Sequence, residues 1–243
     1  MDVSLDMGLG LGLCLAPALT GPRPSPRTTD HARRHMLDTD FFRRWLTNAA
    51  DAVDRTAALL TELDSPIGDA DHGSNLQRGF TAVVVTLEKE VPETPGAVLA
   101  LAGRQLISTV GGASGPLYGT LLRRTGKALG DAAEVDEARF AEALRTGVDA
   151  VAALGGAAPG DKTMLDALMP GVDALGTSFG AARDAAKEGA LATVPLLARK
   201  GRASYLGERS IGHQDPGATS SALLFEALAE TAEESGAPEA DHG

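Results

Sequence analysis

Apolar residues recur at three- and four-residue steps along most of this chain, which is the period of an amphipathic helix. The first such segment begins at Asp40 and carries Phe41, Trp45 and Leu46 on one face. Seven further segments follow, separated by glycine, proline and aspartate, at 76–91, 97–110, 116–130, 136–154, 162–176, 178–200 and 216–234. The pattern predicts eight helices, although the Ala-Val-Val-Val run at 82–85 leaves a strand open for the second segment.

The composition agrees with a helical protein. Aromatic residues make up 4% of the 243 residues, and alanine, glycine and leucine dominate. Strand-rich sandwiches favour β-branched and aromatic residues instead. Because alternating strand patterns are absent and the connections are short, we expect an all-α protein. The expected architecture is an eight-helix antiparallel barrel or bundle, with a binding site in the loops at one end.

We expect one domain over residues 36–235, with a different kind of segment on either side. Residues 8–19 are apolar, but Asp2 and Asp6 precede them where a secretion signal needs basic residues, and the run is too short to span a membrane. Residues 21–34 are rich in proline and arginine, which predicts disorder. Two interpretations of 1–35 stay open: a disordered tail, or an extension from an upstream start site. Residues 236–243 are expected to form a flexible C-terminal tail.

The formal net charge of −11 narrows the choice of partners. Nucleic acids and anionic membrane surfaces attract basic proteins, so we expect no nucleic-acid and no membrane partner. The single cysteine, Cys14, cannot form an internal disulfide, and no cysteine–histidine group has the spacing of a zinc site. These features are typical of a protein in a reducing cytoplasm.

Three aspartates lie close together in the stretch Leu-Asp-Ser-Pro-Ile-Gly-Asp-Ala-Asp-His-Gly, namely Asp64, Asp69 and Asp71. Two carboxylates ~4 Å apart repel by about 4 kcal/mol at an effective dielectric constant near 20, so a converging trio needs a cation. Oxygen ligands without cysteine or histidine favour magnesium. A calcium-binding EF-hand is excluded, because Ser74 and Phe80 stand where that loop needs glycine and glutamate. The alternative is a solvated acidic turn without a ligand.

A glycine-rich stretch, Ser-Thr-Val-Gly-Gly-Ala-Ser-Gly-Pro-Leu-Tyr-Gly, occupies 108–119. Its glycines allow close backbone approach, Ser114 is expected to cap the next helix, and Pro116 suits the first helical turn. The amide groups left free there would form a cradle for an anion. The alternative is a tight turn between helices that touches no ligand. The P-loop, dinucleotide-binding and protein-kinase signatures do not occur in the chain.

A basic segment spans 199–217 in a chain that is otherwise acidic. Its cationic side chains suit phosphate oxygens, although a solvated surface loop is the alternative. They are Arg199, Lys200, Arg202 and Arg209. Asp215 and Pro216 are expected to start the last helix. Asp161 and Lys162 are expected to offer a cap and a cation beside a helix N-terminus.

Four segments carry a resemblance to a known family: Gly-Asp-Ala-Asp-His-Gly-Ser-Asn at 68–75, Gly-Gly-Ala-Ser-Gly-Pro-Leu-Tyr-Gly at 111–119, Pro-Gly-Asp-Lys-Thr-Met at 159–164, and the long run at 198–220. They closely resemble the nucleotide-binding L subunit of bacterial dihydroxyacetone kinase, with similarity from about Leu37 to Glu234. The resemblance implies an eight-helix antiparallel barrel that binds ADP or ATP and two magnesium ions at one end.

The resemblance also assigns residues to the site. Asp64, Asp69 and Asp71 correspond to magnesium ligands that bridge the phosphates. The implied nucleotide contacts are His72, Gly73, Ser74, Asn75, Ala113, Ser114, Gly155, Met164, Arg202, Asp215, Pro216 and Gly217. At Gly155 the neighbouring Gly156 is an alternative. No catalytic residue is assigned beyond these ligands, and His72 and His213 are interpreted as contact or loop-packing residues rather than phosphohistidines.

The family implies partner proteins. A K subunit holds dihydroxyacetone covalently on its own histidine, and in systems with a free-standing L subunit a phosphohistidine M subunit, fed by phosphoenolpyruvate, recharges the bound ADP. A homodimer also stays open. Three alternatives remain: a kinase subunit that uses exchangeable ATP, a non-catalytic metal-binding helical interaction module, and the related nucleotide-binding domain of fatty-acid kinases, which is joined to further domains.

Overall fold

The computed structural model describes residues 36–236. The expectations for the segment 1–35 and for 237–243 lie outside the described residues, and Gly236, the first residue of the expected C-terminal tail, ends the last helix. Within the described range the predicted all-α class is confirmed. The eight α-helices are α1 (Thr39–Asp64), α2 (His72–Lys89), α3 (Pro95–Thr109), α4 (Ser114–Leu129), α5 (Glu137–Gly155), α6 (Leu165–Ala174), α7 (Phe179–Ala192) and α8 (Pro216–Gly236).

Two short elements complete the described part. A 3₁₀-helix, η1, spans Arg202–Ser210 in the connection between α7 and α8. The strands β1 (Leu37–Asp38) and β2 (Glu134–Val135) form an antiparallel pair in which Leu37 lies opposite Val135. Because β2 directly precedes α5, this pair ties the start of α1 to the start of α5.

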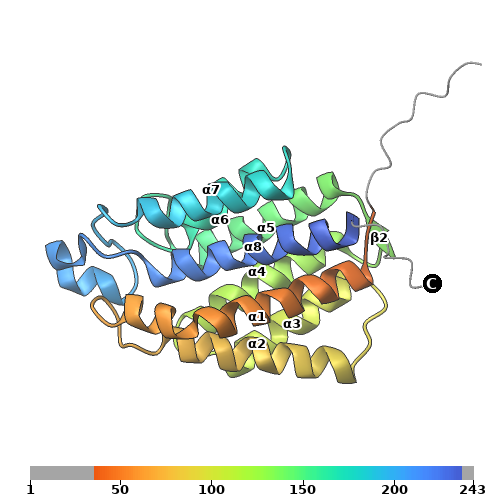
Figure 1. Cartoon of the computed structure of the whole chain (residues 1–243), viewed down its shortest axis with the longest axis horizontal. Helices are drawn as coiled ribbons and strands as arrows, with labels where there is room; N and C mark the ends of the chain where they lie inside the picture. The colour runs from red at the N-terminus through yellow and green to blue at the C-terminus, as the bar shows by residue number, and fades with distance from the viewer. Residues whose placement is uncertain (1–35, 237–243) are drawn as a thin grey trace, which may run out of the picture. The chain divides into compact units, whose positions relative to one another are not determined.

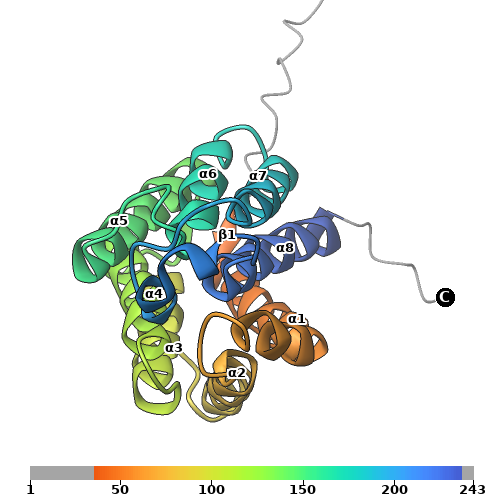
Figure 2. The same ribbon diagram turned by 90° about the vertical axis from the view of Figure 1, so that its left-hand side faces the viewer.

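The eight helices form a closed ring. Each packs against the helix that follows it in sequence, and α8 packs against both α7 and α1, which closes the circle. Figure 2 shows this ring along its axis, with α3, α4 and α5 on one side and α1 and α8 on the other. Successive helices run in opposite directions, so their connections gather at two ends. The loop after α1 and η1 lie at one end, and the strand pair lies at the other (Figure 1).

Local sequence explains why most helices begin where they do. The side chains of Asp38 and Asp136 accept hydrogen bonds of 2.8 Å from the amides of Phe41 and Arg139, which caps α1 and α5. Thr94 caps α3 in the same way, and Pro95 occupies the first turn, where its missing N–H costs nothing.

Aromatic side chains fill the ring near the strand pair. Trp45 is fully buried, and its indole N–H donates to the carbonyl of Leu224 across to α8 at 2.8 Å. Its ring meets Phe140 of α5 edge-on at 5.6 Å, and Phe42 meets Phe140 at 5.2 Å. These contacts lock α1, α5 and α8 together, far from the loops at the other end.

Helices α3 and α4 approach each other closely because glycines face across the contact. A Cβ added at Gly96 would lie 2.2 Å from the carbonyl oxygen of Gly130, and one at Gly126 would lie 2.5 Å from that of Gly96. Any larger side chain would therefore force the two helices apart. Nearer the glycine-rich turn, Gly103 and Gly119 face each other in the same way, since a Cβ added at either would lie 2.7 Å from the carbonyl oxygen of the other.

Three sequence predictions need correction. The run at 82–85 lies within α2, so the strand alternative is wrong. The helix predicted at 178–200 ends at Ala192, because Pro195 lacks an N–H and disfavours helix in the residue before it. The helix predicted at 162–176 is shorter, at 165–174. Within the part of the chain that the structure describes, no helix is long and apolar enough to cross a membrane.

Candidate functional site

The loop between α1 and α2, residues 64–71, brings the three aspartates together. One carboxylate oxygen each of Asp64, Asp69 and Asp71 lies within 4.8 Å of the others. Asp64, the last residue of α1, is buried, and its Oδ2 accepts hydrogen bonds from the amides of Asp71 (3.1 Å) and His72 (3.3 Å). The carboxylate of Asp64 therefore fixes the position of Asp71 and His72 at the far end of the loop.

The backbone of this acidic loop is specialised for the convergence. A Cβ added at Gly68 would lie 1.9 Å from Oδ1 of Asp64, so only glycine fits there. Ala70, between the other two aspartates, has a φ of 59°, which is the left-handed region that a non-glycine residue seldom adopts. Strain of this kind persists where the surrounding structure enforces it, and it gathers at functional sites.

His72 begins α2 beside the acidic loop. Its Nε2 lies 2.8 Å from the hydroxyl of Ser220 on α8, and its Nδ1 lies 3.4 Å from the hydroxyl of Ser114 on α4. Burial lowers the pKa of the imidazole, and the charges of Asp64, Asp71 and Asp69 oppose that shift only in part. The ring is therefore neutral at pH 7 and joins α2, α4 and α8 by hydrogen bonds.

The glycine-rich segment forms the turn before α4. Gly112 has a φ of 65°, and a Cβ added at Gly115 would lie 2.4 Å from the carbonyl oxygen of Val110. The prediction that Ser114 caps α4 is wrong: the N-cap is Ala113, which makes no side-chain cap, and Ser114 turns its hydroxyl to His72. The first-turn amides of α4 thus stay available to a ligand, which is the usual arrangement for binding an anion.

The basic segment lies against the acidic loop at the same end. The guanidinium of Arg202 and the carboxylate of Asp69 form an ion pair of 2.9 Å, in which both side chains are well exposed. An exposed pair of this kind contributes little to stability. A small apolar cluster under it joins the two loops, with Ile67 from the acidic loop packed against Ala198 and Ala203.

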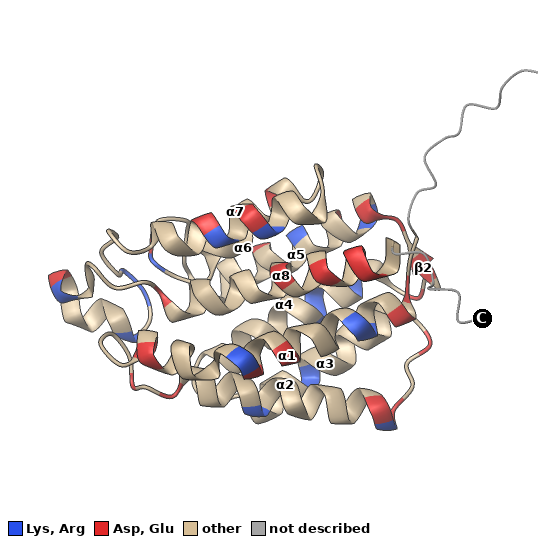
Figure 3. Ribbon diagram, viewed as in Figure 1, with Lys and Arg blue, Asp and Glu red and all other residues tan. Residues whose placement is uncertain are grey.

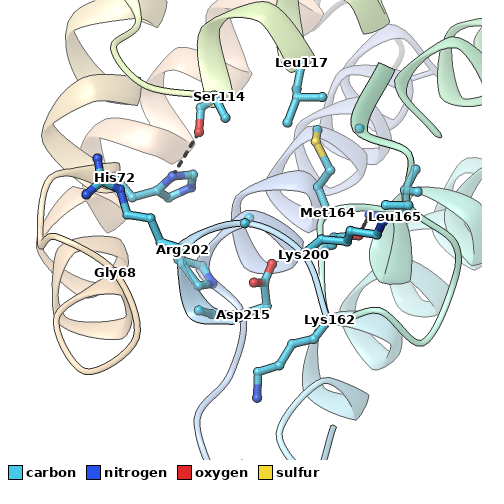
Figure 4. Close-up of a pocket in the computed structure, with 18 of the residues that line it drawn as sticks. Gly68, His72, Ser114, Leu117, Lys162, Met164, Leu165, Lys200, Arg202 and Asp215 are labelled. Carbon is cyan, nitrogen blue, oxygen red and sulfur yellow. Dashed lines mark hydrogen bonds between the residues drawn. The ribbon is translucent and has the colours of Figure 1, made fainter. Parts of the chain in front are cut away.

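Lys162 anchors the backbone around the basic segment to the interior of the protein. It is 1% exposed, and its ammonium donates to the carbonyls of Ser210 (2.7 Å), Leu196 (3.1 Å) and Val194 (3.5 Å). Burial lowers its pKa. Lys162 lies just before the N-terminus of α6, as predicted, but its ammonium points away from the cavity (Figure 4). The helix cap predicted for Asp161 is wrong, since its carboxylate accepts from the amide of Ala158.

Asp215 starts α8, as predicted: its Oδ2 accepts from the amide of Ala218 at 2.7 Å. Its own amide donates to the hydroxyl of Thr193 at 2.9 Å, which ties α8 to the end of α7. Burial raises the pKa of this carboxyl to about 7, with a smaller contribution from Asp166. The carboxyl is therefore partly protonated near neutral pH.

These parts surround one cavity of about 460 Å³, which is within the range of small-molecule sites. One side is polar, with His72, Ser114, Arg202 and the acidic loop, and the opposite side carries Leu117, Met164 and Leu165 (Figure 4). Ten of the expected site residues line this cavity: Asp64, His72, Ala113, Ser114, Gly155, Met164, Arg202, Asp215, Pro216 and Gly217. Gly156 instead takes the left-handed position after α5, with a φ of 56°.

Five expected residues do not line this cavity. Asp69 and Asp71 belong to the acidic trio at its edge. Gly73 packs against α1, where an added Cβ would lie 2.0 Å from the carbonyl of Ala57. Ser74 donates to the carbonyl of Asp71 at 3.0 Å, and Asn75 accepts from Arg78 at 2.6 Å.

Sequence reasoning missed a hydrogen-bond network behind the cavity. The buried hydroxyl of Tyr118 on α4 lies 2.7 Å from Ser220 and 3.0 Å from Ser221, both on α8. Burial raises the pKa of Tyr118 to about 12. Through Ser220 this network reaches His72. A tyrosine within an apolar helical pattern gives no sign of such a role, because its partners are about a hundred residues away.

Comparisons with known proteins agree with this geometry. The family model described as the DAK2 domain matches residues 66–230. The chain is 44% identical over 200 residues to the "PEP-dependent dihydroxyacetone kinase, ADP-binding subunit DhaL" of Escherichia coli (strain K12), covering 78% of this chain and 95% of that one. It is 43% identical over 195 residues to the "PEP-dependent dihydroxyacetone kinase 1, ADP-binding subunit DhaL" of Listeria innocua, covering 80% and 97%.

A solved structure is similar as well. It is the crystal structure of the dihydroxyacetone kinase from C. freundii in complex with AMP-PNP and Mg2+, with a TM-score of 0.61 and 27% sequence identity. The match covers 94% of this chain, and this chain spans 38% of that kinase chain.

Proposed function

Because the chain belongs to the DAK2 domain family, we propose that it is the nucleotide-binding, phosphoryl-transfer subunit of a dihydroxyacetone kinase. In this proposal it holds ADP or ATP with magnesium and passes a phosphoryl group to dihydroxyacetone bound on a K subunit. A phosphohistidine M subunit, fed by phosphoenolpyruvate, recharges the nucleotide. The convergence of three carboxylates and a free helix N-terminus on one cavity carries the proposal.

The donor set fits magnesium. Three carboxylates meet one guanidinium at the acidic loop, so two negative charges remain to attract a divalent ion. We propose Asp64, Asp69 and Asp71 as the ligands. Two ions are proposed because three carboxylates and a diphosphate carry about six negative charges, which two magnesium ions with Arg202 and Lys200 would balance.

The cavity walls suit the two ends of a nucleotide. The apolar side with Leu117, Met164 and Leu165 fits a purine, and the proposed contact at Gly155 lies on that wall. The polar side, with Ser114 and the amides of α4, fits phosphate oxygens. Gly73, Ser74 and Asn75 lie outside the cavity wall, in the first turn of α2 directly after Asp71. We therefore propose that they contact the nucleotide at the edge of the phosphate site.

Phosphoryl transfer here depends on position and charge. Magnesium held by Asp64, Asp69 and Asp71 would, when bound, neutralise negative charge on the phosphate oxygens. Arg202 is free to turn from Asp69 to a phosphate oxygen, because the exposed pair holds it only weakly. The neutral His72 donates or accepts a hydrogen bond without adding charge. The protein has no need of a covalent phosphorylated residue of its own.

The test is reconstitution. The purified chain is mixed with a dihydroxyacetone-binding subunit and a phosphohistidine subunit, phosphoenolpyruvate is supplied, and dihydroxyacetone phosphate is followed. Product that requires all three proteins supports the proposal. Absence of product, with partners shown to be active alongside the E. coli subunit, would contradict it.

The alternative of exchangeable ATP is kept, because the solved relative was crystallised with AMP-PNP. Desalting distinguishes a retained ADP cofactor from an exchangeable nucleotide. A retained cofactor leaves one ADP per chain after desalting, whereas an exchanging subunit loses its nucleotide. If Asp69→Ala leaves ADP binding unchanged, the non-catalytic metal-binding module becomes the better reading. A cytoplasmic location and a homodimer also remain proposals, tested by fractionation and by light scattering.

A further inference from the structure

A second groove, lined by cations, runs along the outer side of α3, α4 and α5. Its volume is about 1040 Å³, more than twice that of the nucleotide cavity. The floor is made of small residues, including Gly96, Ala100 and Ala150. Four cationic side chains project from α3 and α4 around it: Arg104, Arg123, Arg124 and Lys127.

These four cations have no partners. All four are exposed, and within the described residues none takes part in an ion pair or a hydrogen bond. The segment 94–130 contains no aspartate or glutamate at all, in a chain that has 33. Asp131 is the one acidic residue among those described as lining the groove. Such a run without acids is unexpected by chance in an acidic protein, and with four cations and one aspartate the lining of the groove carries a net charge of +3.

The contrast with the other side of the ring is sharp. Helix α8 contains four glutamates and no lysine or arginine, and its ribbon carries acidic segments alone (Figure 3). A chain with a net charge of −11 would repel an acidic partner at long range unless a local positive field attracts it. The groove supplies such a field on the α3–α4 side of the ring, and a localised positive field of this kind favours one orientation of a docking partner.

The groove is poorly suited to a small anion. Sites for small ligands enclose them and place a few buried polar groups against them. Here the four cationic side chains are all exposed. Several exposed charges spread over two helices match an extended surface instead. A nucleic acid would meet strong repulsion from the rest of this acidic chain.

We propose that this basic groove docks an acidic surface of a partner protein in the phosphoryl-transfer assembly, an inference that rests on the proposed function. Leu154, near the end of α5, is 55% exposed and lines both the groove and the nucleotide cavity. A protein seated in the groove therefore reaches the rim of the cavity. That position suits a partner that must exchange a phosphoryl group with a nucleotide bound there.

The experiment compares two variants with the same change in net charge. R104E/R124E reverses the charge of one groove cation on α3 and one on α4. The control, R55E/K187E, reverses the charge of two exposed cations on α1 and α7. The association rate constant of each protein with the dihydroxyacetone-binding subunit and with the phosphohistidine subunit is measured at 50 and 300 mM salt. Thermal melts and ADP affinity of the isolated chains check that both variants are folded.

We expect R104E/R124E to lower the association rate with at least one subunit by about tenfold at low salt and to flatten its salt dependence. The control should stay within about twofold of wild type. Equal losses in both variants, losses in neither, or no binding of wild type to either subunit would overturn the inference. Normal docking without any turnover by wild type would instead sink the proposed function and leave the groove assignment standing.

Two probes test the other occupants. Tripolyphosphate and a double-stranded DNA fragment are titrated against the full chain and against R104E/R124E. Binding of either probe that the variant abolishes, with docking of both subunits unchanged, would overturn the inference by assigning the groove to that ligand. Weak binding of both probes together with the loss of subunit docking supports it.

Discussion

The acidic loop, 64–71, and the basic segment, 199–217, meet at the same end of the ring but are built in opposite ways. In the acidic loop the functional charges themselves are fixed, because Asp64 is buried and holds the amides of Asp71 and His72. In the basic segment, by contrast, Lys162 anchors the backbone at Ser210 from the interior, while the side chain of Arg202 remains exposed at the surface. The difference separates a fixed group of carboxylates from an exposed, adjustable cation.

Electrostatics explains the division. Converging carboxylates repel one another, so the backbone must hold them in position before any ion binds. The strained conformation of Ala70 is part of the backbone that holds them. A guanidinium that serves a phosphate must instead change partner when the ligand arrives. An exposed ion pair with Asp69 is weak enough to allow that exchange.

The largest effect should come from the buried anchor of the basic segment. Lys162→Met leaves three carbonyls without their charged donor, which should lower the free energy of unfolding by about 3 kcal/mol. Hydrogen exchange at 196–210 should rise as well. Lys200→Met, on the exposed part of the same segment, is the control and should change stability by less than about 0.5 kcal/mol. Similar stability of the two variants in chemical denaturation would contradict the assignment of Lys162 as an anchor.

The acidic loop should lose ligand binding rather than stability. Asp64→Asn and Asp69→Asn each remove a proposed magnesium ligand, so the magnesium-dependent affinity for ADP should fall by about 100-fold in both. Only Asp64→Asn should also destabilise the fold, by about 1 kcal/mol, because Asp64 alone is buried and accepts two amides. Calorimetry with and without magnesium measures the affinity. Asp51→Asn, on the exposed face of α1, should match wild type in both assays.

Asp215 should give a trend with pH rather than one fixed change in stability. Its pKa of about 7 lies above the ordinary value of an aspartate, so the folded protein binds more protons than the unfolded chain between about pH 4 and pH 7. This carboxyl therefore destabilises the fold increasingly as the pH rises through that window, and not further above it. Asp215→Asn keeps an oxygen acceptor for the cap, so its stability relative to wild type should increase by up to about 1.4 kcal/mol per pH unit.

Denaturation of both proteins from pH 4 to pH 8 measures this difference. Asp149→Asn, an exposed change of the same kind on α5, should show no trend. A constant gap between wild type and Asp215→Asn across the range would mean that the buried carboxyl titrates normally.

The smallest effect should come from the strained residue of the acidic loop. Ala70→Gly removes the left-handed strain but makes the unfolded chain more flexible, so the free energy of unfolding should change by less than about 1 kcal/mol. Gly68→Ala provides the contrast, because its new Cβ would meet the Asp64 carboxylate. A larger loss in Ala70→Gly than in Gly68→Ala would show that close packing at Gly68 is not what holds the loop.

Much of the fold could be predicted from local sequence. Periodic apolar residues predicted a helix at 97–110, and α3 spans Pro95–Thr109, because a helix that buries one face must repeat its apolar positions. The prediction for 178–200 was too long, since the apolar pattern continued past Ala192 while Pro195 has no N–H to donate a helical hydrogen bond. The strand pair was missed because two residues are too few to show any alternation.

In the candidate site, too, some features could be predicted from local sequence and others could not. The aspartates lie within eight positions of one another, so the sequence left two interpretations, a converging trio or a solvated acidic turn, and the structure brings their oxygens within 4.8 Å. Their role as magnesium ligands stays a prediction. Lys162 could not be interpreted from its neighbours, because the carbonyls that it contacts lie 32 to 48 residues further along the chain.

The sequence by itself determined the helices, the acidic and basic loops and the family, since each depends on residues that are near one another or on a shared motif. Only the tertiary structure decided that Tyr118 and Ser220 support His72, that Lys162 faces inward, and that four cations from α3 and α4 share one groove. The physical reason is that side-chain direction and distant pairing are set by how the helices close into a ring. Short-range patterns carry no information about that closure.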